Sequence, residues 1–334
     1  MQTVLSVLPV LVFVVALELI DTYKLLKLGR VLRTVAAGVG AALVCYGLNT
    51  AIFALGIHAD AWARSGAPVL EEVAKALCVF WLIRAGRIGF MVDGAISGFA
   101  VGAGFAILEN LTYLAGTPTL GFAASAIRGF GTALMHGGAT AIFGSAASHR
   151  VEMSGSLRYA VFAPGLAIAI LIHTLYNQFF LPPAAAAAVL LALLPAVLAF
   201  IFTRSEKALE NWVGTKLDKD MDLLSMITTG VFSSSNAGAY LRSLENAFGP
   251  VVLGDMLCYL QVSLELSAQA KGALLRREWG FPETPDPELP RRLKELAYLE
   301  KQIGRAGRFA LAPLLGSSHR DVWEIHQLND RLSP

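Results

Sequence analysis

Long apolar runs constrain the fold of this chain more than any other feature. A helix that crosses a bilayer needs about 20 mostly apolar residues. Six such stretches stand in the sequence, at roughly 2–20, 34–57, 91–115, 121–147, 158–181 and 184–203. The mean hydropathy of +0.58 is high for a soluble domain. We therefore predict an all-α, polytopic membrane helix bundle, with the lipid bilayer as its surroundings.

The charges divide the chain near residue 203. Residues 1–203 carry 11 Lys/Arg and 8 Asp/Glu, whereas residues 204–334 carry 16 and 17. This contrast predicts a transmembrane domain over 1–203 and a helical, water-exposed domain of unknown role over 204–334, whose charges form solvated faces. The net charge of +2 and the lack of a basic–aromatic pattern argue against a nucleic acid partner.

A seventh span, roughly 67–84, is predicted in spite of its charged residues. With seven spans, ten basic residues of the loops fall on the cytoplasmic side and one falls outside. If 67–84 is omitted, the count becomes four inside and eight outside. Because cytoplasmic loops carry an excess of Lys and Arg, seven spans are favoured. The N-terminus is then outside and the region 204–334 is cytoplasmic.

The predicted spans contain a set of charged and polar residues whose insertion into lipid is energetically costly. A charged side chain near the bilayer centre costs about 2.5–3.5 kcal/mol on insertion scales, so each one is a functional hypothesis. The set comprises Glu71, Glu72, Lys75, Glu109, Arg128, His136, His173 and Asn177. Glu71 and Lys75 are four residues apart, and this spacing predicts an ion pair between them.

The depths of these groups place most of them in one layer. At 1.5 Å per residue, Glu71 and Glu72 lie roughly 6–8 Å below the outer boundary, Glu109 about 9 Å and His173 about 12 Å. His136, at about 22 Å, fits this layer less well.

Three short motifs resemble a known family. They are Glu71-Glu72-Val73-Ala74-Lys75, Phe105 to Glu109, and His173 to Asn177. Together they are similar to the EExxK, FxxxE and HxxxD pattern of the PrsW intramembrane proteases, with Asn177 where that family more often has Asp. The resemblance implies a peptidase that cuts single-span membrane proteins, such as anti-sigma factors, near the outer face of a bacterial cytoplasmic membrane.

Two mechanisms of peptide hydrolysis suit these residues. In the first, Glu71 or Glu72 is the general base, Glu109 shares or relays the proton, and His173 and Asn177 donate hydrogen bonds to the oxyanion. Lys75, His136 and Arg128 support this site. In the second, Glu109, His136 and His173 bind Zn²⁺. The zinc set lacks an HExxH motif and its spacing is dispersed. Because the amide of Asn177 is a poor zinc ligand, we favour the metal-free, glutamic mechanism.

Two other functions compete with the protease. Buried Glu, His and Lys also serve proton- or ion-coupled transporters, although the sequence has no internal repeat of its span pattern. A catalytically inactive membrane scaffold is the third hypothesis. For residues 204–334, regulation or homo-oligomerisation is a hypothesis.

Overall fold

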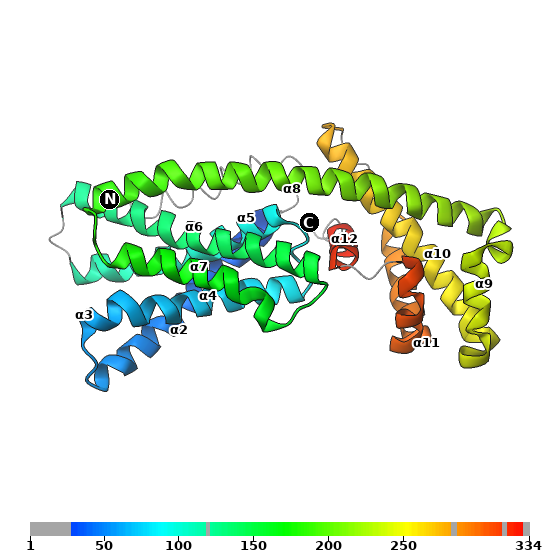
Figure 1. The fold of residues 1–334 in the computed structure, drawn as a ribbon, viewed down its shortest axis with the longest axis horizontal. Coiled ribbons are helices and arrows are strands. Elements are labelled where there is room, and N and C mark those ends of the chain that lie inside the picture. The colour runs from blue at the N-terminus through cyan, green and yellow to red at the C-terminus, as the bar shows by residue number, and fades with distance from the viewer. Residues whose placement is uncertain (1–27, 118–120, 282–285, 316–318, 330–334) are drawn as a thin grey trace. The chain divides into compact units, whose positions relative to one another are not determined.

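The computed structural model describes residues 28–117, 121–281, 286–315 and 319–329, and every regular element within these ranges is a helix (Figure 1). The first predicted span, 2–20, lies outside the described residues. The described residues up to Lys207 form one compact unit, and those from Ala208 onward form a second.

The first unit is built from α-helices and one π-helical turn, η1. They are α2 (Leu28–Ala54), α3 (Ala59–Ala61), η1 (Trp62–Gly66), α4 (Ala67–Arg84), α5 (Met91–Gly116), α6 (Phe122–Ser154), α7 (Tyr159–Asn177) and the first part of α8 (Pro183–Thr228). The helical bundle predicted from the apolar runs is confirmed.

Length and composition qualify five described helices as membrane spans, namely α2, α5, α7, α8 and α10 (Glu245–Glu278). The helix α4 does not meet this measure because Glu71, Glu72, Lys75 and Arg84 interrupt it. The predicted span in α6 also falls outside the five, whereas α10 was predicted as a water-exposed helix. The count of seven spans therefore stays a prediction.

The helix α5 lies at the centre of the first unit and makes its most extensive contacts with α6 and α2. Glycines let these backbones approach closely. A Cβ on Gly102 would lie 2.2 Å from the carbonyl oxygen of His136 on α6, and one on Gly104 would lie 2.0 Å from that of Val35 on α2. In lipid, such close packing replaces the driving force that apolar burial supplies in water. The Gly-rich face therefore fixes α6, and with it His136, against α5.

Local signals set the ends of these helices. Pro68 occupies the first turn of α4, where its missing N–H costs nothing. The buried carboxylate of Asp93 accepts hydrogen bonds from the backbone N–H groups of Gly89 and Phe90, at 2.9 and 3.2 Å, just before α5. Gly155, with φ of +60°, ends α6 in the left-handed conformation.

The second unit contains the remainder of α8 and five further elements. These are the 3₁₀ turn η2 (Val231–Ser234), α9 (Asn236–Ser243), α10, α11 (Leu289–Leu315) and α12 (His319–Asn329). Leu241, Leu260, Leu264, Ile303 and Leu311 belong to its apolar core.

A charged group is buried inside the second unit. Lys271 Nζ lies 2.9 Å from Asp220 Oδ2 and 2.7 Å from Glu324 Oε2, and it also contacts Ser267 Oγ. The expectation that the charges of this region form only solvated faces is wrong for these residues. The reason is that α10 packs against α12, which turns Lys271 inward.

Candidate active site

The helix α4 carries the most deeply buried charges of the first unit. Lys75 is fully buried and forms an ion pair with Glu72, which is 1% exposed. The predicted pair between Glu71 and Lys75 is wrong, because the ammonium group meets the carboxylate three residues earlier rather than four. Both spacings bring side chains onto one helix face, so the choice depends on what else the Lys75 side chain reaches.

Lys75 also reaches His136 on α6 and fixes its tautomer. Lys75 Nζ lies 2.7 Å from His136 Nδ1. An ammonium group can only donate, so Nδ1 accepts and the ring hydrogen is on Nε2. This Nε2 lies 2.5 Å from Glu109 Oε2, to which it donates. The depth estimate from the sequence misplaced His136, because α6 has 33 residues and is longer than a bilayer requires.

His173 on α7 is in the other tautomer, with its ring hydrogen on Nδ1 rather than on Nε2. Its Nδ1 lies 2.8 Å from Glu72 Oε1 and donates a hydrogen bond to that carboxylate. The lone pair is then on Nε2, which lies 3.9 Å from Glu71 Oε2 and 3.4 Å from Asn177 Nδ2. Asn177 Nδ2 also donates to the carbonyl oxygen of Ala63 in η1, at 3.0 Å.

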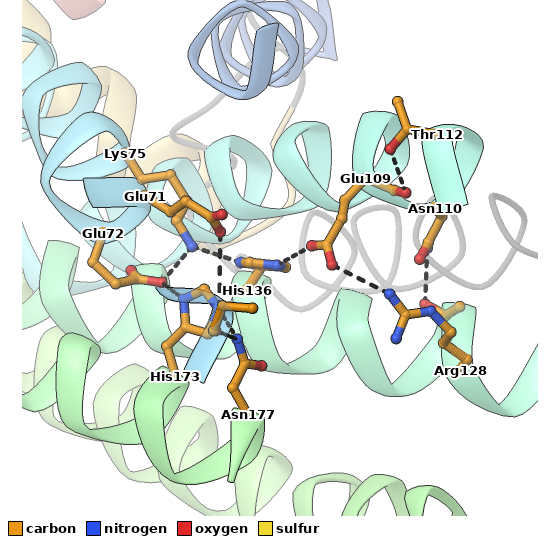
Figure 2. Close-up of polar contacts among 12 residues, drawn as sticks. Glu71, Glu72, Lys75, Glu109, Asn110, Thr112, Arg128, His136, His173 and Asn177 are labelled. Carbon is orange, nitrogen blue, oxygen red and sulfur yellow. Dashed lines mark hydrogen bonds and ion pairs between the residues drawn. The ribbon is translucent and has the colours of Figure 1, made fainter. Parts of the chain in front are cut away.

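Glu109 and Arg128 complete the network. Arg128 Nη2 lies 3.5 Å from Glu109 Oε1, and its guanidinium carbon lies 3.5 Å from the centre of the Tyr113 ring. Figure 2 shows the carboxylates, histidines and Arg128 as one set of contacts that joins α4, α5, α6 and α7. The structure thus brings together all eight residues that the sequence singled out.

Two carboxylates of the set are accessible from cavities. Glu109 is 35% exposed and Glu71 is 14% exposed, whereas the histidines are buried. A cavity of about 90 Å³ is lined by Glu71, Glu109 and Asn49 among others. A second cavity, of about 220 Å³, is lined by Glu109, Arg128 and Asn177 among others. The arrangement therefore presents two acids beside open space, with the His173 ring buried directly behind Glu71.

Sequence reasoning missed Asn49 and Trp62. Asn49 stands in the apolar run of α2 and lines the smaller cavity beside Glu71. Trp62 Nε1 in η1 donates to Asn49 Oδ1 at 2.8 Å and ties the two segments together. Asn49 could have been recognised from the sequence, because it is an amide side chain in an otherwise apolar helix.

A metal ion is the second chemistry to consider. Ligand atoms of Glu71, His136 and His173 all lie within 4.8 Å of one another. Two imidazoles and one carboxylate are a donor set of catalytic zinc, and the contact of Glu72 with His173 resembles the outer carboxylate of such sites. The set fits a zinc ion by residue type and proximity. It contains Glu71, whereas the sequence suggested Glu109.

These features define a class, that of helical integral membrane proteins with a buried acid–histidine site. The model of the PrsW family of intramembrane metalloproteases matches residues 27–203, and the chain belongs to this family. It is therefore an intramembrane protease by family, as the three motifs suggested. No curated protein and no solved structure matches the chain.

Proposed function

We propose that the chain hydrolyses a peptide bond of single-span membrane proteins, such as anti-sigma factors, at or near the outer face. One observation carries the proposal. The lone pair of His173 Nε2 and the partly exposed carboxylate of Glu71 lie 3.9 Å apart, so one water molecule can hydrogen-bond to both.

Glu71 is the proposed general base. Glu72 is occupied by Lys75 and by His173 Nδ1, which leaves it the role of holding His173 in one tautomer. Glu71 has no such ion pair with Lys75 and stands at a cavity wall. It therefore takes the proton of the attacking water, and His173 Nε2 orients that water.

Glu109 and its neighbours serve the other side of the scissile bond. Arg128 can donate hydrogen bonds to the developing oxyanion, and so can the Asn177 amide hydrogen that is not bonded to Ala63, once it turns from His173 Nε2. The proton that Glu71 takes from the water can then reach the leaving amine with Glu109 as the relay, while the His136 Nε2–H holds the Glu109 carboxylate in place. Lys75 keeps the buried carboxylate and imidazole of this network in place.

The glutamic mechanism is favoured over the zinc mechanism by the state of His136. Lys75 donates to its Nδ1 and its Nε2 hydrogen faces Glu109, so neither nitrogen offers a lone pair. If zinc binds, Glu71, His136 and His173 would hold it, with the His136 ring hydrogen on Nδ1 and Lys75 turned away from that atom. Zinc would then supply a Lewis acid and an activated water.

The test is cleavage of single-span reporter proteins by the purified chain, with and without chelator, together with its zinc content. We expect chelator-resistant cleavage and a loss of about 10²–10⁴-fold in kcat for Glu71→Gln. Glu152→Gln, outside the site, is the matched control and should retain activity. Stoichiometric zinc with chelator-sensitive cleavage would overturn the glutamic mechanism.

We also propose a location and a topology. The resemblance to the family implies a bacterial cytoplasmic membrane, and the basic residues of the loops favour a topology in which the loop after α6 and the second unit face the cytoplasm. In a cysteine-free background, Ser154→Cys at the exposed end of α6 should react with an impermeant thiol reagent only from the cytoplasmic side. Labelling from the outside in intact cells would contradict this topology.

Regulation or self-association through residues 204–334 stays a proposal, and a full-length chain that is monomeric and unregulated would refute it.

A further inference from the structure

A large apolar cavity lies next to the candidate active site and has no role in the mechanism above. Its volume is about 470 Å³, and its lining is mostly apolar. The walls come from the end of α5, the start of α6, and the segment from α7 into α8. Tyr113, Ile127, Phe179, Leu181 and Pro183 are among the apolar residues that line it.

Three residues separate this apolar cavity from the site. Arg128, Tyr176 and Phe179 line it, and the same three line the cavity of about 220 Å³ that contains Glu109 and Asn177. Tyr176 crosses from α7 to α6, since a Cβ on Gly131 would lie 2.6 Å from its hydroxyl oxygen. The apolar cavity thus adjoins, across these three shared residues, the space in which a scissile bond would meet the acids.

Arg128 stands at the boundary with a spare donor. Its guanidinium lies over the Tyr113 ring and contacts Glu109 through Nη2. Its Nε is buried, and among the described residues it has no hydrogen-bond partner. A peptide carbonyl that enters beside Arg128 can accept this hydrogen bond once the guanidinium turns towards it, and the gain is that a buried polar group regains a partner.

We propose that the apolar cavity is the pocket for a bulky aliphatic or aromatic side chain of the substrate, next to the scissile bond. This inference rests on the proposed protease function. The volume lies within the range of about 300–1,000 Å³ that is typical of ligand pockets, so one large side chain and part of its neighbour fit. The substrate backbone then passes Arg128, and the side chain enters between α6 and α8.

If the pocket binds a bulky side chain, the wild-type protein should prefer substrates that carry a bulky residue beside the cleaved bond. We would use a library of single-span reporter proteins that are randomised along the span, and locate the cleaved bonds by mass spectrometry. Reporters with Phe or Leu beside the bond should be cut at least about 10-fold faster than the matched Ala reporter, since a missing methylene alone is worth about 10–200-fold in such a pocket.

Small residues on the walls allow a matched test of the location. Ala124 on α6 and Ala186 on α8 line the pocket, whereas the neighbouring Ala123 and Ala188 do not. Ala124→Leu and Ala186→Leu should slow cleavage of the Phe reporter at least about 10-fold and leave the Ala reporter within about twofold. Ala123→Leu and Ala188→Leu should change neither rate.

The possible results distinguish a failure of the pocket proposal from a failure of the proposed protease function. If the wild type cuts Phe and Ala reporters at equal rates, or if the wall variants slow both reporters equally while their thermal stability is unchanged, the pocket is refuted and the protease stands. If the wild type cuts no reporter, the proposed function itself fails. The wild-type preference needs no variant, so a wall variant that does not fold leaves the inference testable.

Discussion

The contact between Gly102 and His136 allows the sharpest prediction. A Cβ on Gly102 would lie 2.2 Å from the carbonyl oxygen of His136, whereas ordinary Cβ contacts begin at 3.4 Å. Gly102→Ala therefore requires α5 and α6 to separate by 1.2 Å, the difference between the two distances. His136 moves with α6, away from Glu109 on α5.

The magnitude follows from the sensitivity of catalysis to position. A misplacement of about 1 Å at a reacting group costs on the order of 10² in rate. Overpacking costs about 1–3 kcal/mol of stability, which a folded bundle can tolerate. We therefore expect Gly102→Ala to insert and fold, with a lowered melting temperature and about 100-fold slower reporter cleavage.

Two further glycines make the assay specific. No heavy atom lies within 4 Å of a Cβ on Gly47, so Gly47→Ala should retain full activity. A Cβ on Gly98 would lie 2.2 Å from the Thr140 carbonyl oxygen, one turn from the site, so Gly98→Ala should destabilise equally but slow cleavage less. Cleavage by Gly102→Ala within threefold of the wild type, in a folded protein, would refute this reasoning.

Three other variants test separate parts of the structure. Lys75→Met leaves the Glu72 carboxylate buried without its cation, so we expect a loss of about 3–5 kcal/mol in the free energy of unfolding and no activity. Lys75→Arg should recover part of both. An unchanged melting temperature in Lys75→Met would contradict the buried pair. Trp62→Phe removes one hydrogen bond to Asn49 and should cost about 0.5–1.5 kcal/mol by thermal unfolding, and a larger loss would mean that the indole packing dominates. In the second unit, burial raises the pKa of Glu324 above 4.5, so the folded state binds the proton more tightly and stability falls as pH rises through the raised pKa. Glu324→Gln should flatten that slope in thermal unfolding of the full chain, and an equal slope in both proteins would exclude Glu324 as its source.

The sequence was a good guide to which residues form the site and a poor guide to how they pair. Lipid makes each buried charge costly, so Glu72, Lys75 and Glu109 could be recognised from their positions in apolar runs. The choice of Glu72 over Glu71 as the partner of Lys75 depends on His136, which lies 61 residues from Lys75. No local spacing contains that information.

The limits of the fold prediction have a similar origin. Apolar runs located α2, α5 and α7 because the period and length of a span are local properties. The burial of Lys271 between Asp220 and Glu324 could not be anticipated, since a mixed charge pattern does not say which face of α10 meets another helix. Asn49 was overlooked because its role depends on Trp62 from the following segment.

The ion pair within α4 has a consequence for the time course of synthesis. Lys75 and Glu72 are three residues apart, whereas His136 and His173 follow their partners by 61 and 101 residues. At about 5–20 residues per second, His136 emerges roughly 3–12 s after Lys75, and His173 roughly 5–20 s after Glu72. During this interval α4 must lie beside a nascent, incomplete bundle with only its own internal pair to offset its charges. We therefore expect translation that is stalled before α7 to leave α4 outside the lipid or held by the insertion machinery.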